Sequence, residues 1–109
     1  MQEPTFLILT ALAGPPLHGY GIMQAIESLT SGAVQVRPGT LYAALDRLTA
    51  EGLVSIAAEE RSGGGQVRRF YTLTDAGGTA LREEAERRRD LATIAVRRLS
   101  TLPTLGESV

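Results

Sequence analysis

The sequence contains no cysteine, and this absence removes several classes of function at once. Disulfide bonds, thiolate zinc sites and cysteine nucleophiles are all excluded. Histidine is almost as scarce, because His18 is the only one in the chain. A metal site needs several ligands, so we expect His18 to cap or pack locally, and we expect no metal and no cofactor. Without a nucleophile and a matching base, the sequence does not predict an enzyme.

A long hydrophobic run and a strong charge imbalance are also missing. The apolar start of the chain has no preceding positive segment, and Pro15 and Pro16 end it far short of a membrane span. We therefore expect neither a signal peptide nor a membrane partner, and a cytoplasmic location. The formal net charge is −1, whereas nucleic-acid-binding domains are usually basic. All 11 basic residues are arginines, however, and their distribution matters more than the sum.

The segment 37–54 carries the clearest pattern in the chain. Leu41, Leu45 and Leu48 recur at helical spacing and predict one buried face. Pro38 suits the first turn of this helix, and Gly52 suits the position just after its end. The opposite face is expected to carry Thr40, Tyr42, Ala43, Asp46 and Arg47. A β-branched segment follows directly after this helix. The same order occurs in winged helix-turn-helix proteins, where a wing hairpin follows the recognition helix.

The remaining segments predict elements on either side of this helix. In chain order we expect a helix at 6–13, a helix at 18–29, a short strand at 34–36, a hairpin of strands at 53–60 and 67–73, and a helix at 76–100. The hairpin tip contains consecutive glycines. Thr74 and Asp75 predict an N-cap for the last helix. Tyr71 and Leu73 are expected to face the core.

The first and last predicted helices both need a second surface to pack on. The first is apolar on nearly every side, so one face should lie on the core and another on a second subunit. In the last helix, apolar and small residues follow alternating steps of four and three, typical of a helix packing along another helix. Arg88 interrupts this series and alanine buries little, but alanines let helices approach closely, so we expect a short antiparallel or crossing contact with the first helix of the partner and no long zipper. The expected dimerisation residues are Phe6, Leu9, Leu81, Ala85, Ala92, Ala95 and Leu99.

The order of these elements and several short sequence blocks resemble the PadR family of winged-helix transcriptional regulators. The resemblance covers about residues 4–100, and its blocks are 18–20, 39–42 with Leu45 and Leu48, 51–54, and 69–74 with Gly77. It implies an α+β, mainly helical fold: a winged helix-turn-helix DNA-binding domain at 1–74, then a long C-terminal dimerisation helix and short tail at 75–109. Ala43, where relatives often have proline, and the glycine-rich wing depart from the family pattern.

The resemblance implies a sequence-specific, DNA-binding transcriptional regulator that acts as a homodimer. Its recognition helices would enter successive major grooves of a pseudo-palindromic, double-stranded DNA operator, and its wings would touch the backbone or the minor groove. A repressor is expected, released by a small-molecule effector bound between the first helix and the terminal helix of the partner. The chain has no tryptophan, so an indole sandwich around a planar drug is missing.

The DNA contacts are assigned to hydroxyl and guanidinium groups near the recognition helix and the hairpin tip, because these groups bond phosphates and base edges. The expected DNA-binding residues are Tyr20, Arg37, Thr40, Tyr42, Arg47, Arg61 and Arg68. Two alternatives stay open: Tyr20 is as well explained as a core residue, and Arg47 as a partner of Asp46, Glu51 or a neighbouring helix. Arg69 is expected to pair with an acid.

Two other features have competing interpretations. The charged run 83–90 contains Glu83–Arg87 and Glu84–Arg88 at i, i+4, which a solvated helical face explains better than a basic DNA arm. The near-neutral net charge also supports a second class of function, a winged-helix adaptor that binds proteins and no specific DNA. Sequencing of DNA fragments selected by the purified protein would separate the two classes.

Overall fold

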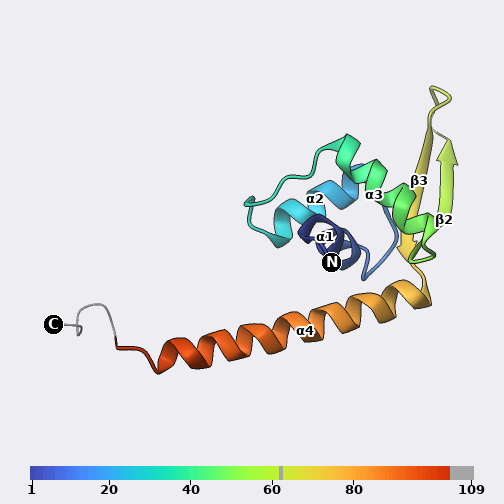
Figure 1. The fold of residues 1–109 in the computed structure, drawn as a ribbon. Coiled ribbons are helices and arrows are strands. Elements are labelled where there is room, and N and C mark those ends of the chain that lie inside the picture. The colour runs from blue at the N-terminus through green and yellow to red at the C-terminus, as the bar shows by residue number, and fades with distance from the viewer. Residues whose placement is uncertain (62, 104–109) are drawn as a thin grey trace.

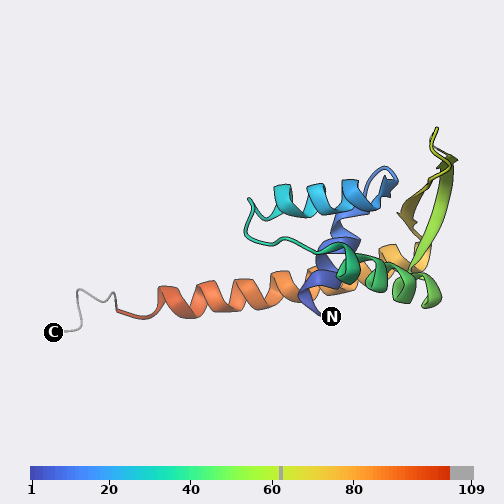
Figure 2. The ribbon, with the colours of Figure 1, turned by 90° about the horizontal axis from the view of Figure 1, so that it is seen from above.

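The computed structural model describes residues 1–61 and 63–103 of the chain. Its elements are α1 (Glu3–Ala11), β1 (Leu17–His18), α2 (Gly19–Leu29), α3 (Pro38–Ala50), β2 (Val54–Arg61), β3 (Val67–Leu73) and α4 (Asp75–Ser100). Helices α1 to α3 form a compact head with the β2–β3 hairpin at one edge, and α4 passes beneath the head and extends away from it (Figures 1 and 2). This is a winged helix-turn-helix fold with a long C-terminal helix, as the sequence predicted.

The sheet is antiparallel, with the strand order β1-β3-β2. In the hairpin, Val54 pairs with Leu73 at the base and Arg61 with Val67 near the tip, and the register shifts between Ile56 and Ala58. Residues 34–36 do not form the strand that their alternation predicted. Val34 and Val36 instead pack against the core from an extended segment. The short strand lies at Leu17–His18, where the chain reaches the free edge of β3.

The helix ends follow from local chemistry. Helix α1 begins at Glu3, earlier than predicted, because Pro4 is tolerated in a first turn. His18 caps α2, since its Nδ1 accepts a hydrogen bond from the Gly21 N–H at 3.0 Å. Thr74 caps α4 in the same way, with its Oγ1 accepting from the Gly77 N–H at 3.0 Å. Gly52 follows α3 with φ of 78°, so the predicted end of that helix and both predicted caps are confirmed.

The core is built from the apolar faces of α1, α2 and α3 and closed by the base of the sheet. Its buried members are Leu7, Ile8, Leu9, Leu12, Ile22, Ile26, Leu41, Leu45, Leu48, Val54 and Tyr71. The predicted leucine face of α3 is therefore confirmed, as is the inward direction of Tyr71. Leu9 is fully buried within this one protomer. Its expected place on a dimer surface is wrong, because the core already encloses the side chain.

Helix α4 is fixed to the head at its first turn. The Thr74 hydroxyl donates to the Gly52 carbonyl at 2.6 Å, and the Thr74 N–H donates to the Leu53 carbonyl at 3.1 Å. Gly77 lies directly against the same turn, because a Cβ at this position would come within 1.9 Å of the Leu53 carbonyl oxygen. Only glycine permits this approach of helix and turn, and the approach sets the direction in which α4 leaves the head.

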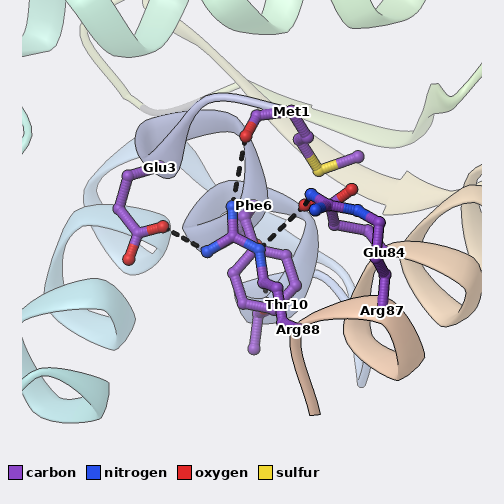
Figure 3. Close-up of polar contacts among 7 residues, drawn as sticks. All are labelled: Met1, Glu3, Phe6, Thr10, Glu84, Arg87 and Arg88. Carbon is purple, nitrogen blue, oxygen red and sulfur yellow. Dashed lines mark hydrogen bonds and ion pairs between the residues drawn. The ribbon is translucent and has the colours of Figure 1, made fainter. Parts of the chain in front are cut away.

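A second attachment lies midway along α4, where Arg88 binds the start of α1 (Figure 3). Its guanidinium lies 4.0 Å from the centroid of the Phe6 ring, a cation–π contact. The same group donates to Glu84 at 2.9 Å, to the Met1 carbonyl at 3.2 Å, and to Glu3. Arg88 therefore joins α1 and α4 within one protomer, a contact that the sequence did not predict, since Arg88 was expected only to interrupt the heptad series of the last helix.

Glu84 holds Arg88 in place from one turn earlier on α4. The predicted Glu84–Arg88 pair is confirmed, and Arg87 donates to the same carboxylate at 2.5 Å, so the Arg87 partner is Glu84 and not the expected Glu83. Hydrogen bonds from Arg88 and then Arg87 lower the pKa of Glu84. Glu3 and Glu84 in turn raise the pKa of Arg88. These interactions favour the charged forms of both the Glu84 carboxylate and the Arg88 guanidinium.

Beyond this cluster, α4 no longer packs on the head. Every residue from 89 to 103 is exposed. The exposed side chains include the large apolar residues Leu91, Ile94, Val96, Leu99 and Leu102. Within the described ranges, no helix has the length and apolarity needed to cross a membrane.

Candidate nucleic-acid interface

Helix α3 presents an outward face of small residues around one aspartate. Gly39, Ala43, Asp46 and Ala50 are spaced by four, three and four, which places them on one side of a helix, opposite the buried leucines. All of them are exposed. Thr40 and Arg47 share the flank that faces α1, and Tyr42 lies on the flank that faces the hairpin. The polar residues that the sequence grouped together are therefore divided between two flanks.

Arg47 is bound to neighbouring protein groups. Its Nη2 donates to the Thr5 hydroxyl of α1 at 2.7 Å, and its Nη1 pairs with Glu51 at 2.9 Å. The alternative in which Arg47 pairs with Glu51 and a neighbouring helix is confirmed. A DNA contact by Arg47 would have to compete with both of these bonds.

A groove of about 600 Å³ lies between α3, the start of α2 and strand β3. Its lining includes His18, Tyr20, Tyr42, Asp46, Arg68, Arg69 and Tyr71. Tyr20 is 62% exposed and Tyr42 46% exposed, so both side chains are open to solvent over much of their surface, and the alternative that placed Tyr20 in the core is wrong. The His18 ring stacks with Tyr20 at 6.5 Å between centroids and meets Phe70 edge-on at 5.3 Å. These contacts give the groove an aromatic wall.

Tyr42 reaches across the groove because α2 begins with glycine. A Cβ on Gly19 would lie 2.3 Å from the Tyr42 hydroxyl oxygen and 2.8 Å from its ring carbon Cζ. The missing side chain at Gly19 therefore leaves the space that Tyr42 occupies. Sequence reasoning identified Tyr42 but missed Gly19, because the two positions lie on different helices.

The cations of the groove come from strand β3. Arg69 pairs with Glu59 of β2 at 3.2 Å, the structural ion pair expected for it. Arg68 also lines the groove; it is exposed and has no ion pair within residues 1–61 and 63–103. Burial raises the pKa of Tyr71 at the base of the groove, while Arg69 opposes that rise. Arg68 is thus the groove arginine that is free to meet an anion.

Two more of the expected cations lie at the ends of elements. Arg37 is the N-cap residue of α3 and is exposed there. Arg61 ends β2, where it pairs in register with Val67 next to the glycine-rich tip. Both are solvent-accessible. In the part of the chain that the structure describes, no group of three or more His, Cys, Asp or Glu residues could hold a metal ion.

The expected dimerisation residues lie in three different environments. Leu9 is in the core, Leu81 packs partly against it, and Phe6 lies under the Arg88 guanidinium. Ala85, Ala92, Ala95 and Leu99 are exposed on α4. The face of α4 that meets its own head contains Gly77, Leu81, Glu84 and Arg88, so Ala85 is displaced from it. Sequence reasoning missed the exposed Leu91 and Ile94, which continue the apolar series beyond Arg88.

Comparison with known sequences gives a consistent result. The sequence model of the transcriptional regulator PadR-like family matches residues 8–83. The chain is 46% identical over 84 residues to an uncharacterized 37.1 kDa protein in transposon TN4556 of Streptomyces fradiae, covering 77% of this chain and 22% of that protein. It is 37% identical over 84 residues to the transcriptional regulator YqjI of Escherichia coli, with 77% and 38% covered. It is 39% identical over 85 residues to the transcriptional regulator Rv3488 of Mycobacterium tuberculosis, with 78% and 75% covered.

Solved structures of similar fold point the same way. A PadR-like transcription factor from Bacteroides fragilis superposes with a TM-score of 0.72 at 28% identity, covering 86% of this chain and 87% of that one. Bacillus subtilis PadR, solved in complex with operator DNA, superposes with a TM-score of 0.70 at 26% identity, covering 78% of this chain and 48% of that one. The chain therefore spans less than half of two of the curated relatives and of Bacillus subtilis PadR, and three quarters of Rv3488.

Proposed function

Because this chain belongs to the PadR-like family of transcriptional regulators, we propose that it binds a pseudo-palindromic operator as a homodimer and represses transcription there. The observation that carries the proposal is the exposed outward face of α3 beside a groove lined by Tyr20, Tyr42 and Arg68. An α-helix fits the major groove of B-DNA, which is about 12 Å wide. Small residues at Gly39, Ala43 and Ala50 allow the helix backbone to approach the bases closely.

The groove beside α3 suits one strand of the DNA backbone. The exposed side chains of Tyr20 and Tyr42 offer hydroxyl donors, and Arg68, which forms no ion pair within the described chain, offers a positive charge. Such groups bond phosphate oxygens and fix the register of a protein on the duplex. Arg37 at the start of α3 and Arg61 near the hairpin tip extend this positive rim, with Thr40 on the opposite flank of α3.

The hairpin tip is the second contact region in this proposal. It is rich in glycine and flanked by Arg61 and Arg68. Without large side chains the tip can approach the sugar-phosphate backbone or enter a narrow minor groove, where arginine is attracted by the enhanced negative potential. Contacts of this kind add affinity for all DNA sequences, while α3 would select among them.

The homodimer is supported by the free half of α4. A helix with exposed apolar side chains is unfavourable in water unless another surface covers it. We assign that surface to a second copy of the chain, with Ala92, Ala95 and Leu99 joined by Leu91 and Ile94 in the contact. The contact would run along α1 and α4 of the partner. Release of the DNA by a small-molecule effector held between α1 of one protomer and α4 of the other belongs to the same proposal, as does a cytoplasmic location.

The test is selection of DNA fragments by the purified protein from a randomised pool, followed by sequencing. We expect an enriched inverted repeat whose half-sites are centred roughly 34–36 Å apart, because two-fold dimers read successive major grooves. Sedimentation of the same sample should give the mass of a dimer. Absence of any enriched sequence would contradict the operator and would favour the alternative of a protein-binding adaptor.

A further inference from the structure

We infer that Asp46 is the side chain of α3 that selects the base sequence, and that it selects cytosine by accepting a hydrogen bond from the N4 amino group in the major groove. The inference rests on the proposed function, since it requires α3 to enter the major groove. It concerns one position in each half-site and so can fail while the proposed function holds.

The position of Asp46 is the first argument. The outward face of α3 consists of Gly39, Ala43, Asp46 and Ala50, all exposed. Glycine and alanine side chains have no hydrogen-bonding group, so Asp46, one turn after Tyr42 at the edge of the groove, is the one member of this face that can bond a base edge. The hydroxyls and guanidinium of Thr40, Tyr42 and Arg47 lie on the flanks, where a helix seated in the groove meets the backbones of the DNA.

The free state of the carboxylate is the second argument. Asp46 forms no ion pair or hydrogen bond with any described residue, although arginines follow it in sequence and lie across the groove. Arg47 is bound to Thr5 and Glu51, and Arg69 is bound to Glu59. Arg47 and Arg69 are thus held by other partners. Arg68 lines the same groove but forms no ion pair with Asp46, so the Asp46 carboxylate stays available as an acceptor.

The chemistry of a carboxylate decides which base it accepts. An ionised aspartate has acceptor oxygens only, so it repels phosphates and base edges that present acceptors. Guanine shows N7 and O6 acceptors, thymine shows O4, and adenine shows N7 beside its amino group. Cytosine alone presents a donor without an acceptor in the major groove. A carboxylate on the reading face therefore favours cytosine and disfavours the other three bases.

The same charge lowers binding to unspecific DNA. A negative group facing a major groove opposes the favourable contacts of Arg68 and the other cations with phosphate, unless a cytosine amino group compensates it. Asp46 would thus increase discrimination in two ways, by a gain on the right sequence and a loss on every other. This explains how a regulator can carry an acid where a cation would bind DNA more tightly.

The experiment compares the wild-type protein with Asp46→Ala, Asp46→Asn and the control Glu27→Ala in selection from randomised DNA. Glu27 lies in the last turns of α2, away from the groove, and its replacement changes the net charge by the same amount as Asp46→Ala. All variants are exposed-site changes within helices, and circular dichroism verifies their folding. The wild type and Glu27→Ala should both enrich cytosine at one position of each half-site.

Asp46→Ala should lose that preference, with discrimination at the position falling about tenfold or more, while preferences elsewhere persist. Its affinity for unrelated DNA should rise. Asp46→Asn should shift the position towards adenine, because an amide pairs bidentately with adenine N6 and N7. Unchanged preferences in Asp46→Ala, or an equal gain in affinity for all sequences, would overturn the inference and leave the proposed function standing. If the wild type enriches no sequence, both are wrong.

Discussion

Gly19 offers a test of the groove at a residue that would not itself touch DNA. In Gly19→Ala the new Cβ would lie 2.3 Å from the Tyr42 hydroxyl oxygen and 2.8 Å from Cζ, whereas ordinary contact begins at 3.4 Å. The far end of Tyr42 must therefore move by about 1 Å or more, which side-chain rotation allows without unfolding the head. We expect the protein to remain folded and its tyrosine to leave the position from which it would reach a phosphate.

The size of the effect follows from the bond that is lost. A hydrogen bond to a charged group contributes about 1.5–3 kcal/mol, so affinity should fall by roughly 10- to 150-fold for each half-site, and the losses at the two half-sites multiply when a homodimer binds the operator. Tyr42→Phe, which removes the same hydroxyl, should cause a loss of similar size. The double variant should be no weaker than Gly19→Ala alone, because both changes remove one contact.

The assay is titration of a labelled operator at fixed salt concentration, with the free energy of unfolding measured in parallel. Gly21→Ala is the matched control: it lies in the same helix turn, and a Cβ there meets its nearest atoms at an ordinary 3.5 Å. The reasoning is refuted if Gly19→Ala binds the operator as the wild type does, or if Gly21→Ala loses the same affinity.

Three further predictions concern α4. Gly77→Ala should destabilise the fold by about 1–3 kcal/mol in thermal unfolding, because its Cβ would lie 1.9 Å from the Leu53 carbonyl oxygen. The control Gly78→Ala, whose Cβ would have nothing within 4 Å, should stabilise the helix slightly. Equal effects of the two substitutions would contradict the contact between Gly77 and Leu53. Glu84 has a lowered pKa, so its contribution to stability should be present near neutral pH and fall away as pH drops below about 4.5, and thermal unfolding of Glu84→Gln should lack that part of the pH dependence. Leu99→Glu should shift the sedimenting species from dimer towards monomer. It should leave the unfolding temperature of the head unchanged, because Leu99 is 66% exposed in the protomer. A dimer of unaltered stability would exclude Leu99 from the dimer contact.

Local signals allowed much of this fold to be predicted. The leucines at 41, 45 and 48 define a buried face through spacing alone, and Gly52 and Thr74 mark helix ends through properties of a single residue. Strand β1 could not be predicted in this way. Its two residues become a strand only because the edge of β3 is available beside them. Val34 and Val36 show the converse case, a strand-like pattern that has no strand to pair with.

The candidate site was predicted less completely, because it depends on which side of a helix faces which neighbour. The spacing of the leucines in α3 distinguishes a buried face from an exposed face. It does not show that Arg47 reaches α1 or that Tyr42 lies against Gly19. Likewise, a helix as uniformly apolar as α1 does not reveal that Leu9 faces inward. The interactions of Arg88 with Phe6 and Glu3 join positions far apart in sequence, and no local pattern signals them.

The two attachments of α4 make this helix a lever. It is fixed to the head at Gly77 and again at Arg88, and the remainder extends free of the protomer. The part beyond Arg88, residues 89–100, is about 18 Å long, so a change of about 10° in its direction at Arg88 would displace the far end by about 3 Å. In a dimer joined through the free ends, that displacement would change the separation of the two α3 helices. The spacing of the DNA half-sites would therefore be determined by a backbone contact at Leu53 and an arginine on Phe6, neither of which meets the DNA.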